Sequence, residues 1–220
     1  MNGEFAAEGD LIQLITDEED EVNSKEAYGE EIPILSVRNT VLFPGVVIPI
    51  TVGRQRSIRL VKKAQKGNKY IGVCAQIQPN QDDPSWEDLY QVGTLAKIIK
   101  MIVLPDGNTT IIIQGKKRFA IREQVTDDPY FMAKVDYLEE NFPKNSKKIK
   151  ALEESLKDAA IKILHLNPEI PREAQVALDN IDNTAFLTHF LSSNINAPVE
   201  SKQRLLEIND GVERATLLLE

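Results

Sequence analysis

The chain has 220 residues, of which 42% are hydrophobic and 27% are charged, a composition ordinary for one large or two modest globular domains. The formal net charge of -8 disfavours nucleic-acid binding, because phosphate recognition needs concentrated Lys and Arg. The sequence contains no run of about 18 apolar residues that could span a bilayer. The acidic N-terminus also lacks the basic-then-apolar order of a secretory signal. We therefore expect a cytoplasmic protein with no membrane partner.

The first 31 residues are strongly acidic. Five carboxylates follow one another at residues 17–21, and the only apolar patch lies at residues 11–15. Such a segment cannot bury enough apolar surface to offset the entropy cost of ordering it. We expect residues 1–31 to form a disordered, solvated tail, with docking of the apolar patch on a partner as the alternative.

Residues 33–53 contain two short runs rich in β-branched residues, separated by Phe-Pro-Gly at residues 43–45. Both runs are too short for an ordinary helix, so the pattern predicts two strands joined through a turn. Pro33 and Pro49 lack the N–H that a central strand would need. They therefore place these runs at strand starts, bulges or sheet edges.

A basic helix is predicted over residues 54–69, where Ile58, Val61 and Ala64 fall on one helical face. The basic residues lie largely elsewhere on that helix: Arg54, Arg56, Arg59, Lys62, Lys63, Lys66 and Lys69. We favour a solvated outer face, because no aromatic residues interleave the charges to stack on bases. Contact with an acidic partner or with nucleic acid is the alternative.

From residue 32 to about residue 141, short β-prone segments alternate with turn signals. A long hairpin is predicted from residues 94–104 and 109–114, with Gly115 interrupting its second arm. The other expected elements are a buried strand at 70–77, a short helix at 84–89, and strands at 118–122 and 131–138. We expect a small, curled antiparallel β domain, or partial barrel.

The pattern changes between residues 141 and 146, after which apolar residues recur at steps of three and four. Helices are predicted around residues 149–166, from Pro171 to Ile181, around 186–191, from about 197 to 208, and from 212 onward. The fold class is therefore α+β, with a β-rich lobe over 32–141 and a helical bundle over 146–220.

Four groups of residues in this order resemble the N-terminal domain of ATP-dependent Lon proteases. The groups are Arg38-Asn39 with Phe43-Pro44-Gly45 and Val52-Gly53-Arg54, the segment 88–96, the segment 104–107, and the segment 115–119. The resemblance implies a β lobe followed by a helical lobe that leads toward an ATPase domain. It also implies a parent protein that is an ATP-dependent serine endopeptidase with a Ser-Lys pair, uses ATP and Mg, and assembles as a homohexameric ring.

The chain itself shows no recognisable active site. It lacks the glycine-rich loop with Lys and Ser/Thr that cradles nucleotide phosphates. His165 and His189 have no neighbours at metal-ligand spacing, and the Asp pairs at 82–83 and 127–128 stand beside prolines, as turn residues do. Cys74 lies in an apolar run and is expected in the core. We therefore expect no catalytic, cofactor-binding or metal-binding residue here.

A binding role is the sharper hypothesis, because several apolar residues lie at or near turns, where full burial is difficult. The candidate polypeptide-binding residues are Phe43, Pro44, Val46, Val47, Met101, Leu104 and Pro105. The alternative is that these residues simply close the β core.

The resemblance implies that the chain is the substrate-recognition region of a Lon protease. It would bind unfolded or degron-bearing polypeptides and deliver them to ATPase and protease domains in protein quality control. The last residues, Leu217-Leu218-Leu219, are still apolar, so we expect the native chain to continue. The alternative function is a free-standing peptide- or small-molecule-binding module without a protease.

Overall fold

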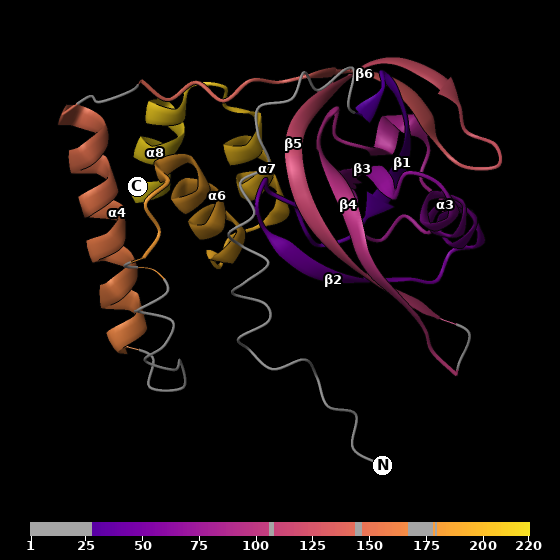
Figure 1. Cartoon of the computed structure of the whole chain (residues 1–220), viewed down its shortest axis with the longest axis horizontal. Helices are drawn as coiled ribbons and strands as arrows, with labels where there is room; N and C mark the ends of the chain where they lie inside the picture. Colours follow the sequence, from indigo (N-terminus) through magenta and orange to yellow (C-terminus); the bar gives the residue numbers. More distant parts are fainter. Residues whose placement is uncertain (1–27, 106–107, 144–146, 167–177, 179) are drawn as a thin grey trace. The chain divides into compact units, whose positions relative to one another are not determined.

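A computed structural model describes residues 28–105, 108–143, 147–166, 178 and 180–220 (Figure 1). The chain divides into two compact units, Met1–Leu138 and Glu139–Glu220. Within the described residues, the first unit is built on a β-sheet and the second on helices. Tyr28 to Glu31, which we expected in the tail, belong to the β unit: strand β1 begins at Glu31, and the Tyr28 ring lies 4.9 Å from the Tyr70 ring. The rest of the predicted tail lies outside the described residues.

The β unit holds a six-stranded sheet in the order β2-β5-β4-β3-β1-β6. The strands are β1 Glu31–Val37, β2 Val47–Val52, β3 Tyr70–Ala75, β4 Val92–Val103, β5 Thr109–Thr126 and β6 Met132–Tyr137. Because β6 also pairs with β5, all strands except β2 form a closed ring. Strand β2 is attached only to β5, so Pro49 lies in an edge strand, where its missing N–H breaks no ladder.

One strand pair departs from the predicted antiparallel arrangement. Strands β1 and β3 pair in parallel, with Ile34 opposite Gly72 and Val37 opposite Ala75. The chain between them runs through β2 and helix α3, Gln55–Lys66. A parallel pair requires such a long crossover connection, and β2 together with the predicted basic helix provides it. The remaining pairs are antiparallel.

Two apolar clusters fill the β unit. In the first, Leu60, Val61 and Ala64 of α3 pack against residues of the sheet such as Leu35 and Ile71. The second cluster is built around two buried aromatic side chains; its members are Ile32, Ile34, Cys74, Leu89, Leu95, Phe119, Phe131, Ala133 and Val135. Trp86, in the short helix η1 (Trp86–Asp88), covers its edge, with its ring 4.5 Å from that of Phe131. Cys74 is fully buried, as expected from its apolar surroundings.

The Phe-Pro-Gly segment forms a turn that is seated on β5. The N–H of Val46 donates to the carbonyl oxygen of Phe43 at 3.2 Å, and Gly45 has φ +77°, as a type II turn requires. The N–H of Gly45 donates to the carbonyl of Gly115, and the N–H of Gly115 donates to that of Val46, both at 2.9 Å.

The predicted interruption at Gly115 is a bulge and not a break: the pairing of β5 with β4 shifts here, with Leu95 opposite Lys117 and Ala96 opposite Gly115. The strand runs unbroken through it, from Thr109 to Thr126. A Cβ at position 115 would lie 2.2 Å from the carbonyl oxygen of Phe43. The glycine is present because the Phe43 turn approaches the β5 backbone closely, and glycine is the residue that permits such an approach.

The helical unit contains, among its described residues, α4 Lys147–Leu166, α6 Thr184–Asn194, α7 Val199–Glu207 and α8 Gly211–Leu219. Side-chain caps begin two of them: Asn183 accepts from the N–H of Phe186, and Asp210 accepts from the N–H groups of Val212 and Glu213. Leu156, Leu178, Leu187 and Ala215 form its buried core. The helix predicted from Pro171 falls mostly on residues 167–177 and 179, which lie outside the described residues.

The buried Arg214 side chain connects separate segments of the helical unit through hydrogen bonds. Arg214 is fully buried and donates to a carboxylate oxygen of Glu140 at 2.8 Å and to the carbonyl of Ile208. Nε2 of His189, also buried, lies 3.1 Å from the other Glu140 oxygen and 3.2 Å from Nη1 of Arg214. His189 therefore has a structural role; the side chain of His165 lies outside the described part.

Replacing Gly115 by Ala should destabilise the β unit by about 1–3 kcal/mol, the usual cost of overpacking, because backbone atoms must move. Urea unfolding followed by the fluorescence of Trp86, the single tryptophan, measures this. Gly67→Ala is the matched control, because its Cβ would meet nothing closer than 3.6 Å. Equal stability of the Gly115→Ala variant and the unmodified chain would refute the packing account.

Replacing Glu140 by Gln should destabilise the helical unit by about 3–5 kcal/mol, because it leaves the buried Arg214 charge without its counterion. Arg214→Met should cost less, since it removes the buried charge together with the pair. Thermal unfolding followed by helical circular dichroism measures both. Glu154→Gln, an exposed change in the same unit, should stay within about 0.5 kcal/mol. A Glu140→Gln variant as stable as this control would contradict the interpretation that Glu140 is the counterion of the buried Arg214.

Candidate functional site

The far end of the β4–β5 hairpin carries the largest run of exposed apolar side chains in the described β unit. Ile102 is 38% exposed, Val103 is 59% exposed and Leu104 is 37% exposed, and Pro105 beside them is also exposed. Figure 1 shows this end of the hairpin projecting from the rest of the β unit. Contiguous exposed apolar side chains of this kind usually mark a binding surface. We call residues 102–105 the hairpin end.

Strand pairing explains why the hairpin end is exposed. Strand β3 pairs with β4 only from Thr94 to Lys97, so the rest of β4 has no described strand on that side. On the other side, β2 ends at Val52, which lies opposite Thr109, the first residue of β5. On the side of β4 the hairpin is therefore longer than its neighbour β3, whereas on the side of β5 it is flanked by β2 as far as its last paired residues. Ile102 and Val103 lie beyond the end of β3, and Leu104 and Pro105 lie beyond both neighbours.

A groove of about 650 Å³ lies between the free edge of β2 and the beginning of α3. Its lining joins the end of β1 to β2 and to the first residues of α3: Ser36, Val37, Arg38, Thr40, Ile48, Pro49, Ile50, Thr51, Val52, Gly53, Arg54 and Ser57. No described strand pairs with the other edge of β2. The lining combines apolar side chains, mostly of β2, with polar ones, and it includes the two arginines Arg38 and Arg54. We call this cavity the β2 groove.

The two arginines of the β2 groove also form hydrogen bonds and an ion pair with neighbouring residues. Arg54 donates to Ser36 Oγ at 3.0 Å and to Gln76 Oε1 at 2.6 Å. Arg38 forms an ion pair with Asp82 at 2.7 Å. Burial, and then the proximity of Arg38, lowers the pKa of Arg54 below the usual value for an arginine.

The structure separates the candidate residues predicted from sequence into buried and accessible ones. Phe43, Pro44 and Val46 are buried, with Phe43 fully so. The prediction that they form a surface is wrong, because the turn faces β5 and is seated against Gly115. Their turn position suggested exposure, but the glycine that receives the turn lies 72 residues away from Phe43 in the sequence.

The other candidate residues differ among themselves. Leu104 and Pro105 are exposed and lie at the hairpin end. Met101 is half-buried and packs on the core cluster below the hairpin end, and Val47 is half-buried in β2. The sequence analysis missed two members of the hairpin end, Ile102 and Val103. The signal was available: the predicted hairpin was longer than the strands predicted around it.

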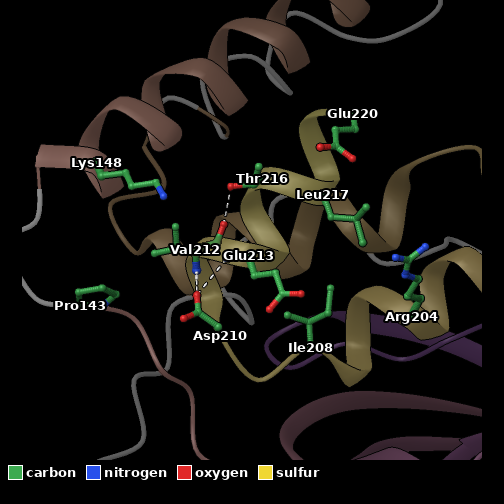
Figure 2. Close-up of a pocket in the computed structure, with 10 residues that line it drawn as sticks. All are labelled: Pro143, Lys148, Arg204, Ile208, Asp210, Val212, Glu213, Thr216, Leu217 and Glu220. Carbon is green, nitrogen blue, oxygen red and sulfur yellow. Dashed lines mark hydrogen bonds between the residues drawn. The ribbon is translucent and has the colours of Figure 1, made fainter.

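The helical unit has a cavity of its own, of about 630 Å³ (Figure 2). Charged side chains of both signs surround it, with a few apolar ones between them; its lining is Pro143, Lys148, Arg204, Ile208, Asp210, Val212, Glu213, Thr216, Leu217 and Glu220. In Figure 2, Asp210 points at the first turn of α8, where it caps the helix. These contacts are those of a helix terminus, and they define no ligand chemistry.

The described residues offer little for catalysis. No cluster of three or more His, Cys, Asp or Glu that could hold a metal ion occurs among them. Cys74 is enclosed, and burial raises the pKa of its thiol to about 12, so it stays protonated at neutral pH. None of the described helices is both long and apolar enough to cross a membrane. The hairpin end and the β2 groove are thus two accessible features of the described part of the β unit.

Comparison with known proteins identifies the family. Residues 31–220 match the family of the ATP-dependent protease La (LON) substrate-binding domain. The chain is 60% identical over 212 residues to a Lon protease of Cytophaga hutchinsonii and 46% identical over 213 residues to a Lon protease of Flavobacterium johnsoniae. Each match covers 96% of this chain and 26% of the relative. The chain therefore spans about a quarter of the length of these relatives.

Solved structures show the same fold. The N-terminal domain of a Mycobacterium avium complex Lon protease matches with a TM-score of 0.68 at 21% identity, covering 86% of this chain and 96% of that one. The Lon N-terminal domain protein of Xanthomonas campestris matches with a TM-score of 0.62 at 20% identity, with the same coverage. With the family match over residues 31–220, this chain belongs to the Lon substrate-binding domain family.

Proposed function

We propose that the hairpin end is the surface by which this substrate-binding domain holds polypeptides. The observation that carries the proposal is the exposure of consecutive apolar side chains, from Ile102 to Leu104, on a hairpin whose base is fixed. Unfolded and damaged proteins expose apolar segments that native proteins bury. Burying such a segment against the hairpin end removes apolar surface of both partners from water, which stabilises the complex.

The fixed base of the hairpin supports this role. Strands β4 and β5 pair up to Val103 and Thr109, and β2 pairs with β5 over the same stretch. The apolar side chains are therefore held in place before a polypeptide arrives, so that less conformational entropy is lost on binding. Met101, packed beneath them, has an unbranched side chain that adapts to differently shaped partners.

The wider function follows from the family and is part of the same proposal. The parent protein would be an ATP-dependent serine endopeptidase with a Ser-Lys pair, which uses ATP and Mg, assembles as a homohexameric ring and acts in cytoplasmic protein quality control. This domain would hold unfolded or degron-bearing polypeptides and pass them to the ATPase and protease domains. The curated relatives cited above are all Lon proteases, so the free-standing binding module receives no support.

Replacing Ile102, Val103 and Leu104 together by Ser should weaken binding of an unfolded polypeptide by about tenfold or more. Full burial of one such side chain is worth about 1.5–3 kcal/mol, and about 1.4 kcal/mol is a factor of ten in affinity. Fluorescence anisotropy with reduced, carboxymethylated α-lactalbumin, which cannot refold, measures the change.

The matched control is Ile163→Ser, which removes an apolar side chain that is 63% exposed on α4 of the helical unit. It should leave affinity unchanged. All of these side chains are exposed, so neither variant should lose much stability, and circular dichroism checks this. Wild-type affinity in the triple variant, or an equal loss in the control, would exclude the hairpin end as the binding surface.

A further inference from the structure

The charge of this chain is distributed very unevenly. Residues 1–27 contain nine of its 34 acidic residues and one of its 26 basic residues, a net charge of -8. Residues 28–220 hold 25 of each sign and are therefore neutral overall. The whole net charge of the protein thus belongs to the segment that precedes the β unit. The described part of the chain contains one strongly charged face of the opposite sign, on α3.

Helix α3 presents a row of exposed cations. Arg59, Lys62, Lys63 and Lys66 are all exposed, and they follow one another at steps of three, one and three, which places them on one side of the helix. The opposite side, with Leu60, Val61 and Ala64, is buried against the sheet. The helix has no acidic residue at all. Within the described residues, none of the four cations forms an ion pair.

The β2 groove opens at the beginning of the same helix. Gly53, Arg54 and Ser57 line it, whereas the cationic row begins at Arg59, further along the helix and on its exposed side. A groove with apolar side chains at the start of a helix, followed along the helix by a cationic row, suits a segment that is apolar at one end and acidic at the other. The N-terminal segment has this order: Leu11-Ile12-Gln13-Leu14-Ile15 is followed, after one Thr, by the five carboxylates of residues 17–21.

We propose that residues 11–21 of this chain bind to its own β unit, with the apolar residues 11–15 in the β2 groove and the acidic residues 17–21 along the cationic row of α3. The occupant is part of the same chain, so this inference does not depend on the proposed function of the hairpin end. Its basis is charge complementarity together with the matching order of apolar and charged parts.

The lengths agree with this arrangement. The eight residues from Arg59 to Lys66 span about 12 Å at 1.5 Å per residue, and five extended residues span about 17 Å at 3.3–3.6 Å each, enough to reach the whole row. The groove lies at the far end of β1, about 23 Å from Glu31 for its seven residues. The 13 Cα–Cα steps from Ile15 to Tyr28 reach about 43–47 Å when extended. A connection of this length also gives the bound segment an effective concentration on the order of millimolar.

A spin label on the segment tests the proposal in the full 220-residue chain. Gln13→Cys introduces an accessible thiol, whereas the single native cysteine, Cys74, is buried and is not labelled in the folded protein. A nitroxide at position 13 should remove most of the amide NMR signal intensity of β2 and of the first turns of α3. Raising the salt from about 0.1 M to about 1 M shortens the Debye length from about 10 Å to about 3 Å and should restore those signals.

Two matched variants distinguish binding to the cationic row from a general effect of the changed net charge. Lys62→Glu, Lys63→Glu and Lys66→Glu together should restore the signals. Lys147→Glu, Lys150→Glu and Lys162→Glu, which change three exposed lysines of α4 by the same charge, should leave the intensity loss unchanged. An intensity loss that survives in the α3 variant, or the absence of any loss at β2 and α3, would overturn the proposal.

The same label distinguishes binding within one molecule from binding between molecules. Unlabelled ¹⁵N protein is mixed with spin-labelled protein of natural isotope abundance. The proposal predicts no loss of signal in this mixture, because each segment occupies its own β unit. Loss of the β2 and α3 signals in the mixture would show that a second copy supplies the segment, and it would contradict the proposed arrangement.

Discussion

The close contact between the Phe43 turn and Gly115 is the constraint on which the β unit depends. At Gly115, strand β5 passes from the closed ring, where it pairs with β6, to the hairpin, where it pairs with β2. The turn at residues 43–45 is bonded to β5 at this point and leads directly into β2. A glycine is required because the carbonyl oxygen of Phe43 occupies the place of a side chain. One contact therefore positions β2 and, through it, the base of the hairpin.

This arrangement explains how a small β unit can present apolar side chains without losing its shape. The ring and the two core clusters provide stability, and β2 supports the hairpin on one side up to Val52. Ile102 to Pro105 lie beyond the end of the β3–β4 pairing, add little to the core and stay exposed. Surface that contributes to binding is thus separated from surface that contributes to folding. The same separation holds at α3, which buries one side and leaves a cationic row on the other.

Local pattern was enough to predict most elements, because strands, helices and turns leave periodic signals. The hairpin, the basic helix, α4 and the buried Cys74 were all predicted from such signals. The parallel β1–β3 pair and the burial of Phe43 were not, because both depend on partners distant in sequence. Gly115 was predicted to interrupt the arm, and the pairing does shift there, but the close approach of the Phe43 backbone was not foreseen, since a glycine that admits another backbone has the same local signature. For the candidate site, Leu104 and Pro105 were found, while Ile102 and Val103 were missed because exposure depends on where neighbouring strands end.

The central claim is that polypeptides bind at the hairpin end, and photo-crosslinking tests it most directly. A benzophenone amino acid would replace Val103 in one protein and Ile163 in another, since both side chains are about 60% exposed and lie in different units. Each protein would be irradiated with the same unfolded polypeptide. The account predicts crosslinking from position 103 and little from position 163. Equal crosslinking from both positions, or crosslinking from 163 alone, would contradict it.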